Sequence, residues 1–200
     1  MTALRFVALD LSSAGTGVAW NCNHHGRESV GCRTVHSRWG ADRPHDRIHD
    51  ILTDIAAAVK CKPHLVVVEG GSYGSAGNQV DQLAGLRWVV RHWLWAQKLP
   101  YVEVAPGTVK VWATGSGATS GDNKVTKQAV REAITATYGR LCHVADHNQA
   151  DAVSMLTLAC RAYGQPLALV TRQQQTRALA AVKWPDLASE TGPVVPAVTR

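Results

Sequence analysis

Hydrophobic residues occur along the chain in two arrangements, short continuous runs and longer helical repeats. The short runs, bounded by glycine, proline and small polar residues, predict strands at residues 4–10, 18–22, 29–37, 64–70 and 101–106. Glycine-containing turns connect the first three runs, which predicts an antiparallel meander. The fourth run has four consecutive apolar residues and is typical of a strand covered on both faces.

Apolar residues with helical spacing occupy much of the remaining sequence. They predict helices at residues 43–59, 78–98, 123–138, 147–164 and 168–183. The order of three strands, helix, strand, helix, strand and further helices is that of an α/β fold. We expect a mixed five-stranded sheet, three antiparallel strands followed by two parallel ones, with helices on both faces. Residues 107–122, rich in Gly, Ser and Thr, are expected to form a mobile loop.

The length and composition of the chain predict one domain. Residues 1–183 are expected to form a single globular domain, and the Pro-rich residues 184–200 a disordered tail. No apolar run approaches the roughly 18 residues that span a bilayer, so we expect no membrane partner. The first apolar stretch contains Asp10, which argues against a secretory signal and favours a cytoplasmic protein.

The balance of charges favours a polyanion as partner. The chain has 21 Lys and Arg against 15 Asp and Glu, a formal net charge of +6. Basic proteins gain affinity for nucleic acids because neutralised phosphates release counterions. The five cysteines include no CxxC pair, so we interpret them as reduced thiols rather than as disulfides or a zinc site.

Several acidic residues occupy positions at which active sites form in α/β folds. Asp10 ends the first predicted strand and Glu69 the fourth, and parallel pairing of these strands would place the two carboxylates side by side. Asp151 lies in the first turns of a predicted helix, with Asp146 just before it. Converging carboxylates repel one another unless a cation holds them, and Mg²⁺ or Mn²⁺ suits such oxygen ligands. Two ions per site would serve phosphodiester cleavage.

Each acid also has a structural interpretation. Asp10 is able to begin a turn, and Glu69 is also explained as an exposed acid at a strand end. Asp146, with Gln149 three residues later, suits a helix N-cap as well as it suits a metal ligand. The strand-end positions favour function for the first two, and an unpaired acid at Asp151 inside a helix would be costly, which favours a ligand role.

Four motifs follow one another between residues 4 and 163, namely VALDLSSAGTGVAW, LVVVEGGSYG, APGTVKVWATGSGATSGDNKVTKQAV and NQADAVSMLTLA. They resemble those of the RuvC-type Holliday-junction resolvases of the RNase H-like superfamily. The resemblance implies an RNase H-like fold and a metal-dependent endonuclease that resolves four-way DNA junctions without a small-molecule cofactor. Divergent small resolvases of this kind occur in phages, which makes a phage origin one expectation.

The resemblance implies roles for individual residues. Asp10, Glu69 and Asp151 match the family's acidic metal ligands. Lys110 and Lys127 match basic positions near the backbone of the junction.

The sequence departs from the family pattern at other site positions. The fourth ligand of the family, an Asp or His three residues before the last Asp, falls on Asn148, which is able to ligate weakly through its carbonyl. Asp146 and His147 compete with Asn148 for this role, and Asp146 is slightly favoured. Tyr73 stands one position later than the aromatic residue that the family inserts at the junction, and we expect it to contact DNA. Lys124, in a loop longer than that of the family, is expected to contact phosphates.

The predicted helix at residues 78–98 has more apolar surface than one core face needs. It carries Trp88, Trp93 and Trp95 besides several leucines and valines. It is either a central buried helix or a helix with one face in a dimer interface, where aromatic residues are enriched. The resemblance favours a homodimer, because a two-fold symmetric enzyme suits a two-fold symmetric four-way junction.

The motifs and the charge together favour an endonuclease that cuts branched DNA. The alternatives are an RNase H-like nuclease for an RNA–DNA hybrid or a replication fork, and a catalytically inactive module that binds branched DNA. A sugar-kinase or actin-like ATPase also begins with a strand, an Asp and a Gly-Thr-Gly turn. Such an ATPase needs two domains of this kind, which 200 residues do not hold.

Overall fold

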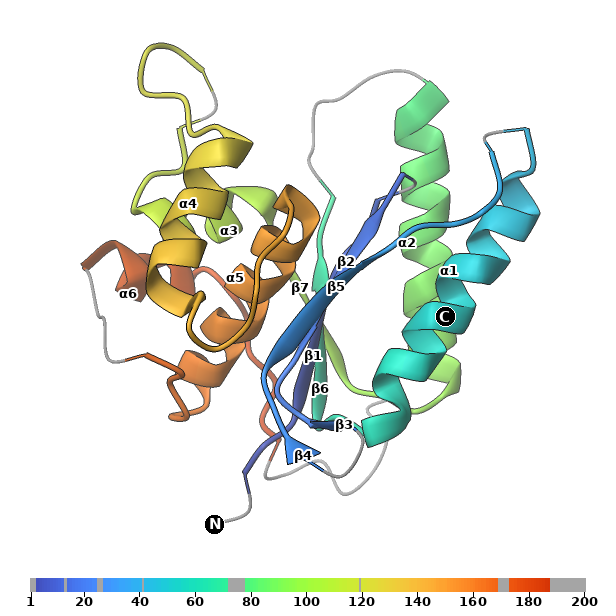
Figure 1. The fold of residues 1–200 in the computed structure, drawn as a ribbon, viewed down its shortest axis with the longest axis horizontal. Coiled ribbons are helices and arrows are strands. Elements are labelled where there is room, and N and C mark those ends of the chain that lie inside the picture. Colours follow the sequence, from blue (N-terminus) through green and yellow to red (C-terminus); the bar gives the residue numbers. More distant parts are fainter. Residues whose placement is uncertain are drawn as a thin grey trace, which may run out of the picture.

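A five-stranded mixed sheet forms the centre of the molecule (Figure 1). The structure is a computed structural model, and it describes residues 3–12, 14–24, 27–40, 42–71, 78–118, 120–168 and 173–187. Its strands, in the spatial order β5-β2-β1-β6-β7, are β1 (Phe6–Asp10), β2 (Thr16–Trp20), β5 (Gly31–Val35), β6 (Leu65–Glu69) and β7 (Tyr101–Val104). The pairs β1–β2 and β2–β5 are antiparallel, whereas β1–β6 and β6–β7 are parallel. The predicted sheet, three antiparallel strands followed by two parallel ones, is confirmed. A separate two-stranded ribbon, β3 (Asn23–His24) and β4 (Arg27–Glu28), lies in the β2–β5 connection.

Helices cover both faces of this sheet (Figure 1). One face carries α1 (Pro44–Ala58), the 3-10 helix η1 (Val59–Cys61) and α2 (Asn78–Ala96). The other face carries α3 (Pro106–Thr114), α4 (Lys127–Tyr138), α5 (His147–Ala162) and α6 (Gln173–Ala180). Helix α5 packs directly on β1 and β2, so it is the helix that brings its side chains nearest to the centre of the sheet.

Each face of the sheet has its own hydrophobic core, because successive strand residues point to opposite sides. In β6, Leu65 and Val67 belong to the core on the α5 side, while Val66 and Val68 belong to the core on the α1–α2 side. All four are fully buried. The interpretation of this run as a strand covered on both faces is confirmed.

Residues 106–114, most of which were expected to lie in a mobile loop, form helix α3. Pro106 lies in its first turn, and Gly115 ends it with a φ of 85°. Val109 and Trp112 are buried, and the Trp112 indole N–H donates a hydrogen bond to Thr157 Oγ1 at 2.9 Å. The loop prediction was wrong for this part because two apolar residues three positions apart suffice to seat a short helix on α5.

Cys22 and Cys61 form a disulfide, which corrects the interpretation of all five cysteines as reduced thiols. Cys22 follows β2 and Cys61 ends η1, and their Cα atoms lie 6.2 Å apart, within the usual range for disulfides. The two residues are 39 positions apart, so no local motif revealed the pair. Cys32, Cys142 and Cys160 are free thiols.

Residues 184–187, assigned from sequence to the tail, pack against the α5 layer. The Trp184 and Tyr163 rings meet edge to face with centroids 5.9 Å apart, and the Tyr163 hydroxyl donates to the Pro185 carbonyl at 2.6 Å. Residues 188–200 lie outside the described residues. None of the helices in the described ranges combines the length and apolarity needed to cross a membrane.

Candidate active site

Asp10 and Glu69 end two neighbouring parallel strands. In β1 and β6 Leu9 pairs with Val68, so the residues that follow them emerge at the same carboxyl edge of the sheet. Asp10 is 6% exposed and the Glu69 side chain 15% exposed, and the two carboxyl groups are joined by a hydrogen bond. The structure therefore brings these two acids together at the place expected from the strand order.

The pKa values of both acids are shifted upward. Burial raises the pKa of Asp10 well above its ordinary value, and the charges of Glu69 and Asp151 raise it further. Burial also raises the pKa of Glu69, although the hydrogen bond from Asp10 and the guanidinium of Arg87 oppose that rise. The interaction between the two groups raises the pKa of Asp10 and lowers that of Glu69, so Asp10 is the one of the two that takes up a proton more readily.

Asp151 of α5 completes a group that we call the acidic centre (Asp10, Glu69 and Asp151). Burial, followed by the charge of Glu69, raises the pKa of Asp151 to about 7. Two lysines oppose these rises in pKa, Lys127 at all three acids and Lys110 at Asp151. The acidic centre therefore consists of one buried and two half-buried acids that repel one another when charged and that two cations partly compensate.

Lys127 is the first residue of α4. The side chain of Thr126 caps this helix by accepting a hydrogen bond from the Ala129 N–H at 3.1 Å. A cation in the first turn opposes the helix dipole, so local helix energetics disfavour a lysine here. Its electrostatic contact with three carboxylates explains the position better than helix stability does.

Helix α5 approaches the acidic centre because Gly17 has no side chain. Gly17 pairs with Asp10 across β1 and β2. A Cβ atom added to Gly17 would lie 2.0 Å from the backbone oxygen of Asn148 and 2.5 Å from its carbonyl carbon. The first turn of α5 therefore rests directly on the backbone of β2, and this contact holds Asp151 close to Asp10.

Arg87 of α2 is a site residue that sequence reasoning missed. Its Nη2 lies 3.6 Å from Glu69 Oε2, and the two side chains are only 12% and 15% exposed. Its Nε is buried and has no hydrogen-bond partner in the described part of the chain. The signal was present in the sequence, because Arg87 stands four residues after Leu83 and three before Val90, on the apolar face of the helix.

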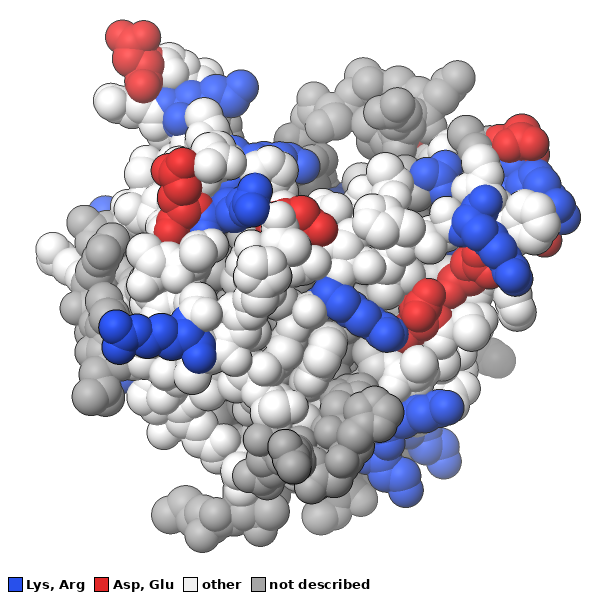
Figure 2. Space-filling view, in the orientation of Figure 1, with Lys and Arg blue, Asp and Glu red and all other residues white. Residues whose placement is uncertain are grey.

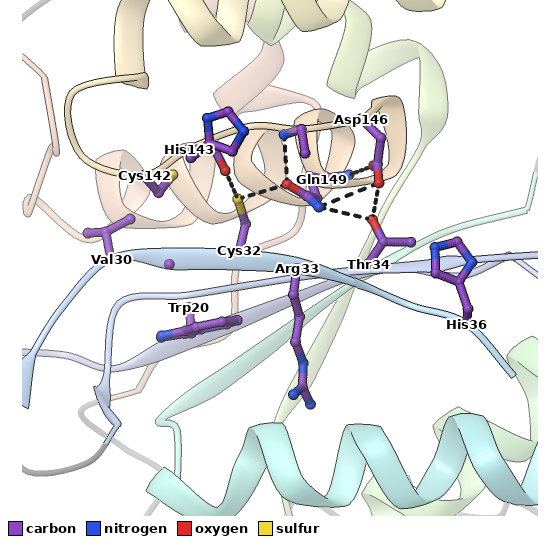
Figure 3. Close-up of a pocket in the computed structure, with 12 residues that line it drawn as sticks. Trp20, Val30, Cys32, Arg33, Thr34, His36, Cys142, His143, Asp146 and Gln149 are labelled. Atoms are coloured by element: carbon purple, nitrogen blue, oxygen red, sulfur yellow. Dashed lines mark hydrogen bonds between the residues drawn. The ribbon is translucent and has the colours of Figure 1, made fainter.

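Asp146 caps helix α5 and does not join the acidic centre. Its Oδ1 accepts a hydrogen bond from the Gln149 N–H at 2.9 Å, and its Oδ2 accepts one from the Thr34 hydroxyl. Burial alone would raise the pKa of Asp146, but these hydrogen bonds and one from the Asn148 N–H hold it below its ordinary value. The carboxylate faces β5 (Figure 3), and its role as an N-cap accounts for its geometry.

His147 follows the cap and stands four residues before Asp151, a spacing that places both on one side of α5. Its Nδ1 is buried without a hydrogen-bond partner in the described ranges, which suits a metal ligand. Across the described residues, however, no three His, Cys, Asp or Glu side chains are already spaced to hold a metal ion. The donors fit a divalent cation by their chemistry, and their side chains would have to turn toward it.

The remaining predicted contacts are distributed around this centre. Lys110 of α3 is partly exposed, and Lys124 is exposed in the segment between α3 and α4, where its N–H donates to the Gly121 carbonyl at 3.1 Å. Lys124 is not one of the two lysines that shift the pKa values of the acids. Tyr73 lies outside the described residues.

The order of the strands and the carboxylates at the ends of β1 and β6 define an RNase H-like fold. Among solved structures the chain is similar to Thermus thermophilus RuvC in complex with a Holliday junction substrate, with a TM-score of 0.60, 12% identity and coverage of 84% of this chain and 100% of that one. It is also similar to a second Thermus thermophilus RuvC structure, with a TM-score of 0.53, 16% identity and coverage of 83% and 100%. No family model and no curated protein matches the sequence. The predicted resemblance to RuvC-type resolvases is confirmed at the level of the fold.

Proposed function

We propose that the protein is a divalent-metal-dependent endonuclease that cuts branched DNA, with the four-way Holliday junction as its substrate. The observation that carries the proposal is the acidic centre, one buried and two half-buried carboxylates beside two lysines that act on their pKa values. It lies on a fold shared with a RuvC whose solved structure includes a Holliday junction substrate. Buried acids that raise one another's pKa are costly to the fold, and such groups concentrate at functional sites.

Asp10, Glu69 and Asp151 would bind Mg²⁺ or Mn²⁺, two ions in all, with His147 as the fourth ligand. His147 is proposed in place of Asp146 because the carboxylate of Asp146 is occupied as a helix cap. When bound, such ions activate the attacking water and stabilise the leaving oxygen. The protein holds two ligands at the ends of adjacent strands and the third on α5, and any proton on these acids must leave before they can bind a cation.

Lys110 and Lys127 would contact the phosphates on either side of the cleaved bond. Lys124 would contact a phosphate further along the same DNA strand. The first two already act on the acids, so a phosphate bound at the acids would lie within their reach. Figure 2 shows basic and acidic side chains interspersed over one face of the molecule. On this face, the distribution favours contact with DNA through a few placed lysines over contact through one broad basic surface.

A substrate panel tests the proposed function. We expect the protein to nick a four-way junction in Mg²⁺ or Mn²⁺, to leave ends that DNA ligase reseals, and to cut a linear duplex of the same sequence far more slowly. Chelation with EDTA should abolish cleavage. A replication fork and an RNA–DNA hybrid complete the panel. Preferential cleavage of the hybrid would contradict the proposal, as would tight junction binding without cleavage in either metal.

Arg87→Gln is expected to raise the Mg²⁺ concentration needed for half-maximal cleavage by roughly tenfold at neutral pH, as loss of a partner of a metal ligand typically does. The guanidinium lowers the pKa of Glu69, so its removal favours the protonated form, which cannot bind a cation. The defect should shrink as the pH rises, and Arg87→Lys should restore part of the affinity. Calorimetric Mg²⁺ titration of the protein alone gives a measurement independent of cleavage.

Arg91→Gln is the matched control for this experiment. Arg91 lies one turn further along α2 and pairs with Glu103 at 2.6 Å instead of with the acidic centre. It should leave the Mg²⁺ requirement unchanged. Equal effects of the two variants on Mg²⁺ binding would show that Arg87 acts only through the general stability of α2.

The exposed face of α2 is proposed as the interface of a homodimer. Leu86, Val90 and Leu94 are buried in the core, whereas Trp88 is 68% exposed and Trp95 50% exposed. Residues seven apart lie on the same side of a helix, so the two indoles share one exposed side of α2. Large exposed aromatic side chains are typical of interfaces, and a second copy of the chain would match the symmetry of the junction.

The double variant Trp88→Ala/Trp95→Ala is expected to sediment as a monomer at concentrations at which the unchanged protein sediments as a dimer. Loss of two central aromatic residues should weaken association at least about a hundredfold, since each such residue contributes roughly 2 kcal/mol or more. Leu141→Ala is the control, because Leu141 is also exposed, at 43%, but lies after α4. A dimer that survives the double variant would place the interface elsewhere.

A further inference from the structure

A second group of reactive side chains lies outside the acidic centre, beside the edge strand β5. A surface pocket of about 530 Å³ is lined by residues of β2, β5 and the α4–α5 connection (Figure 3). Two free thiols line it, Cys32 of β5 and Cys142 of the connection. The proposed nuclease reaction uses neither of them, and the three residues of the acidic centre are not among the residues that line this pocket.

The two thiols are held next to each other. Cys32 Sγ lies 3.1 Å from the carbonyl oxygen of His143, the residue that follows Cys142, and both sulfur atoms are directed into the same pocket (Figure 3). The Cys32 thiol donates to that carbonyl, and the two thiols also shift each other's pKa values. Both residues are partly exposed, so a small solute reaches them from the surface.

The two thiols are chemically unequal. The neighbouring Cys32 thiol lowers the pKa of Cys142 by stabilising the Cys142 thiolate. The interaction with Cys142, followed by burial, raises the pKa of Cys32. Since the thiolate is the nucleophile in thiol chemistry, Cys142 is the residue that attacks first. Cys32 is the resolving residue, which attacks the mixed disulfide that Cys142 has formed.

We propose that Cys32 and Cys142 form a thiol–disulfide exchange site for low-molecular-weight disulfides such as oxidised glutathione. The Cys142 thiolate attacks one sulfur of the disulfide, forms a mixed disulfide and expels the first thiolate. Cys32 then loses its proton, attacks the Cys142 sulfur and expels the second thiolate, which takes up that proton. Two protein thiols are oxidised to one Cys32–Cys142 disulfide, and one small disulfide is reduced to two thiols.

The new disulfide would fasten the edge strand to the segment that leads into α5. These elements already meet through the hydrogen bond between Thr34 and Asp146, and Cys32 Sγ lies 3.6 Å from Gln149 Oε1. A covalent bond closes a loop of about 110 residues, which should raise the melting temperature by roughly 5–15 °C. The pair therefore makes the stability of the contact between β5 and the segment before α5 depend on the concentration of small disulfides in the surroundings.

The other cysteines provide internal references. Cys160 is fully buried, and burial raises the pKa of its thiol to about 12, so it should not react while the protein is folded. Cys22 and Cys61 are already joined to each other. Reaction confined to Cys32 and Cys142 would therefore be specific to the pocket.

The test is peptide mapping by mass spectrometry after the native protein is incubated with oxidised glutathione. Trypsin leaves Cys142 and Cys160 in one peptide, residues 141–161, so fragment spectra must separate them. The unchanged protein should form the Cys32–Cys142 disulfide and melt at a higher temperature. Cys32→Ser should retain glutathione on Cys142, because a serine hydroxyl cannot displace the adduct. In Cys142→Ser, Cys32 should stay unmodified.

Three results would overturn the proposal. The first is a stable glutathione adduct on Cys142 of the unchanged protein, without a bond to Cys32. The second is modification of Cys32 in Cys142→Ser at the rate seen in the unchanged protein. The third is reaction of Cys160 as fast as of Cys142, which would trace the chemistry to unfolding. None of these measurements depends on DNA cleavage, so they stand apart from the proposed nuclease function.

Discussion

Asp10→Asn is expected to lower the rate of junction cleavage by about three orders of magnitude or more and, in the presence of EDTA, to stabilise the fold. The loss of rate follows from the loss of a cation ligand, because bound cations contribute several kcal/mol of transition-state stabilisation and about 1.4 kcal/mol is a factor of ten. The gain in stability follows from burial, since the asparagine carries no charge that must be neutralised. Loss of activity with a gain in stability is characteristic of a strained functional site.

The direction of the stability change depends on pH. The pKa of Asp10 is raised in the folded protein, so the stability that its neutral form confers is present at low pH and is lost as the pH rises through the folded pKa. The advantage of Asp10→Asn should therefore grow with pH. Asp151→Asn should also stabilise the fold, and its advantage should grow as the pH rises toward 7. The expected gain in the free energy of unfolding is on the order of a few kcal/mol, because burial raises the pKa of Asp151 from 3.8 to about 7.

Thermal unfolding between pH 5 and pH 8, with EDTA or with Mg²⁺, measures these stabilities beside single-turnover cleavage assays. Mg²⁺ should stabilise the unchanged protein and reduce the advantage of the variants, since a ligand that binds only the folded state raises its stability. Asp54→Asn is the control, because its partly exposed ion pair with Arg33 should contribute little. If Asp10→Asn lowers stability as well as activity, Asp10 is a structural residue and the acidic centre loses its assigned role.

The sheet and two members of the acidic centre were predictable because their signals are local. An apolar run that ends in an acid marks the carboxyl end of a strand. Parallel pairing of two such strands places Asp10 and Glu69 at the same edge of the sheet. The interpretation of Asp146 as a cap was equally local, since the Gln149 backbone lies three residues away. In each case the sequence neighbours of a residue determine the environment of its side chain.

Other features depend on pairs of residues that are distant in sequence. The contact between Arg87 and Glu69, and the disulfide between Cys22 and Cys61, arise only when separate elements pack together. Helix α3 was hidden for a related reason, because its stability comes from the contact of Trp112 with α5 and not from its own composition. These features are therefore determined by tertiary packing, which local sequence patterns do not encode.

Gly17→Ala is expected to destabilise the protein by about 3 kcal/mol or more, which corresponds to a melting temperature roughly 10 °C lower. The added methyl group would lie 2.0 Å from the backbone oxygen of Asn148, and a helix backbone cannot yield as a flexible side chain would. The first turn of α5 must then move away from β2. Because Asp151 lies on α5, even a shift of about 1 Å should reduce cleavage about a hundredfold at temperatures at which the variant is folded.

Gly85→Ala makes the same chemical change with the opposite expected sign. Gly85 lies inside α2, and a Cβ atom there would meet nothing within 4 Å, so alanine should raise stability by about 0.5–1 kcal/mol through its better helix propensity. Thermal melts and cleavage rates of the two variants, compared side by side, isolate the effect of space at Gly17. Unchanged stability in Gly17→Ala would mean that α5 does not rest on the backbone of β2. Asp151 would then lack the contact that holds it beside Asp10, and the acidic centre would have to be assembled by another route.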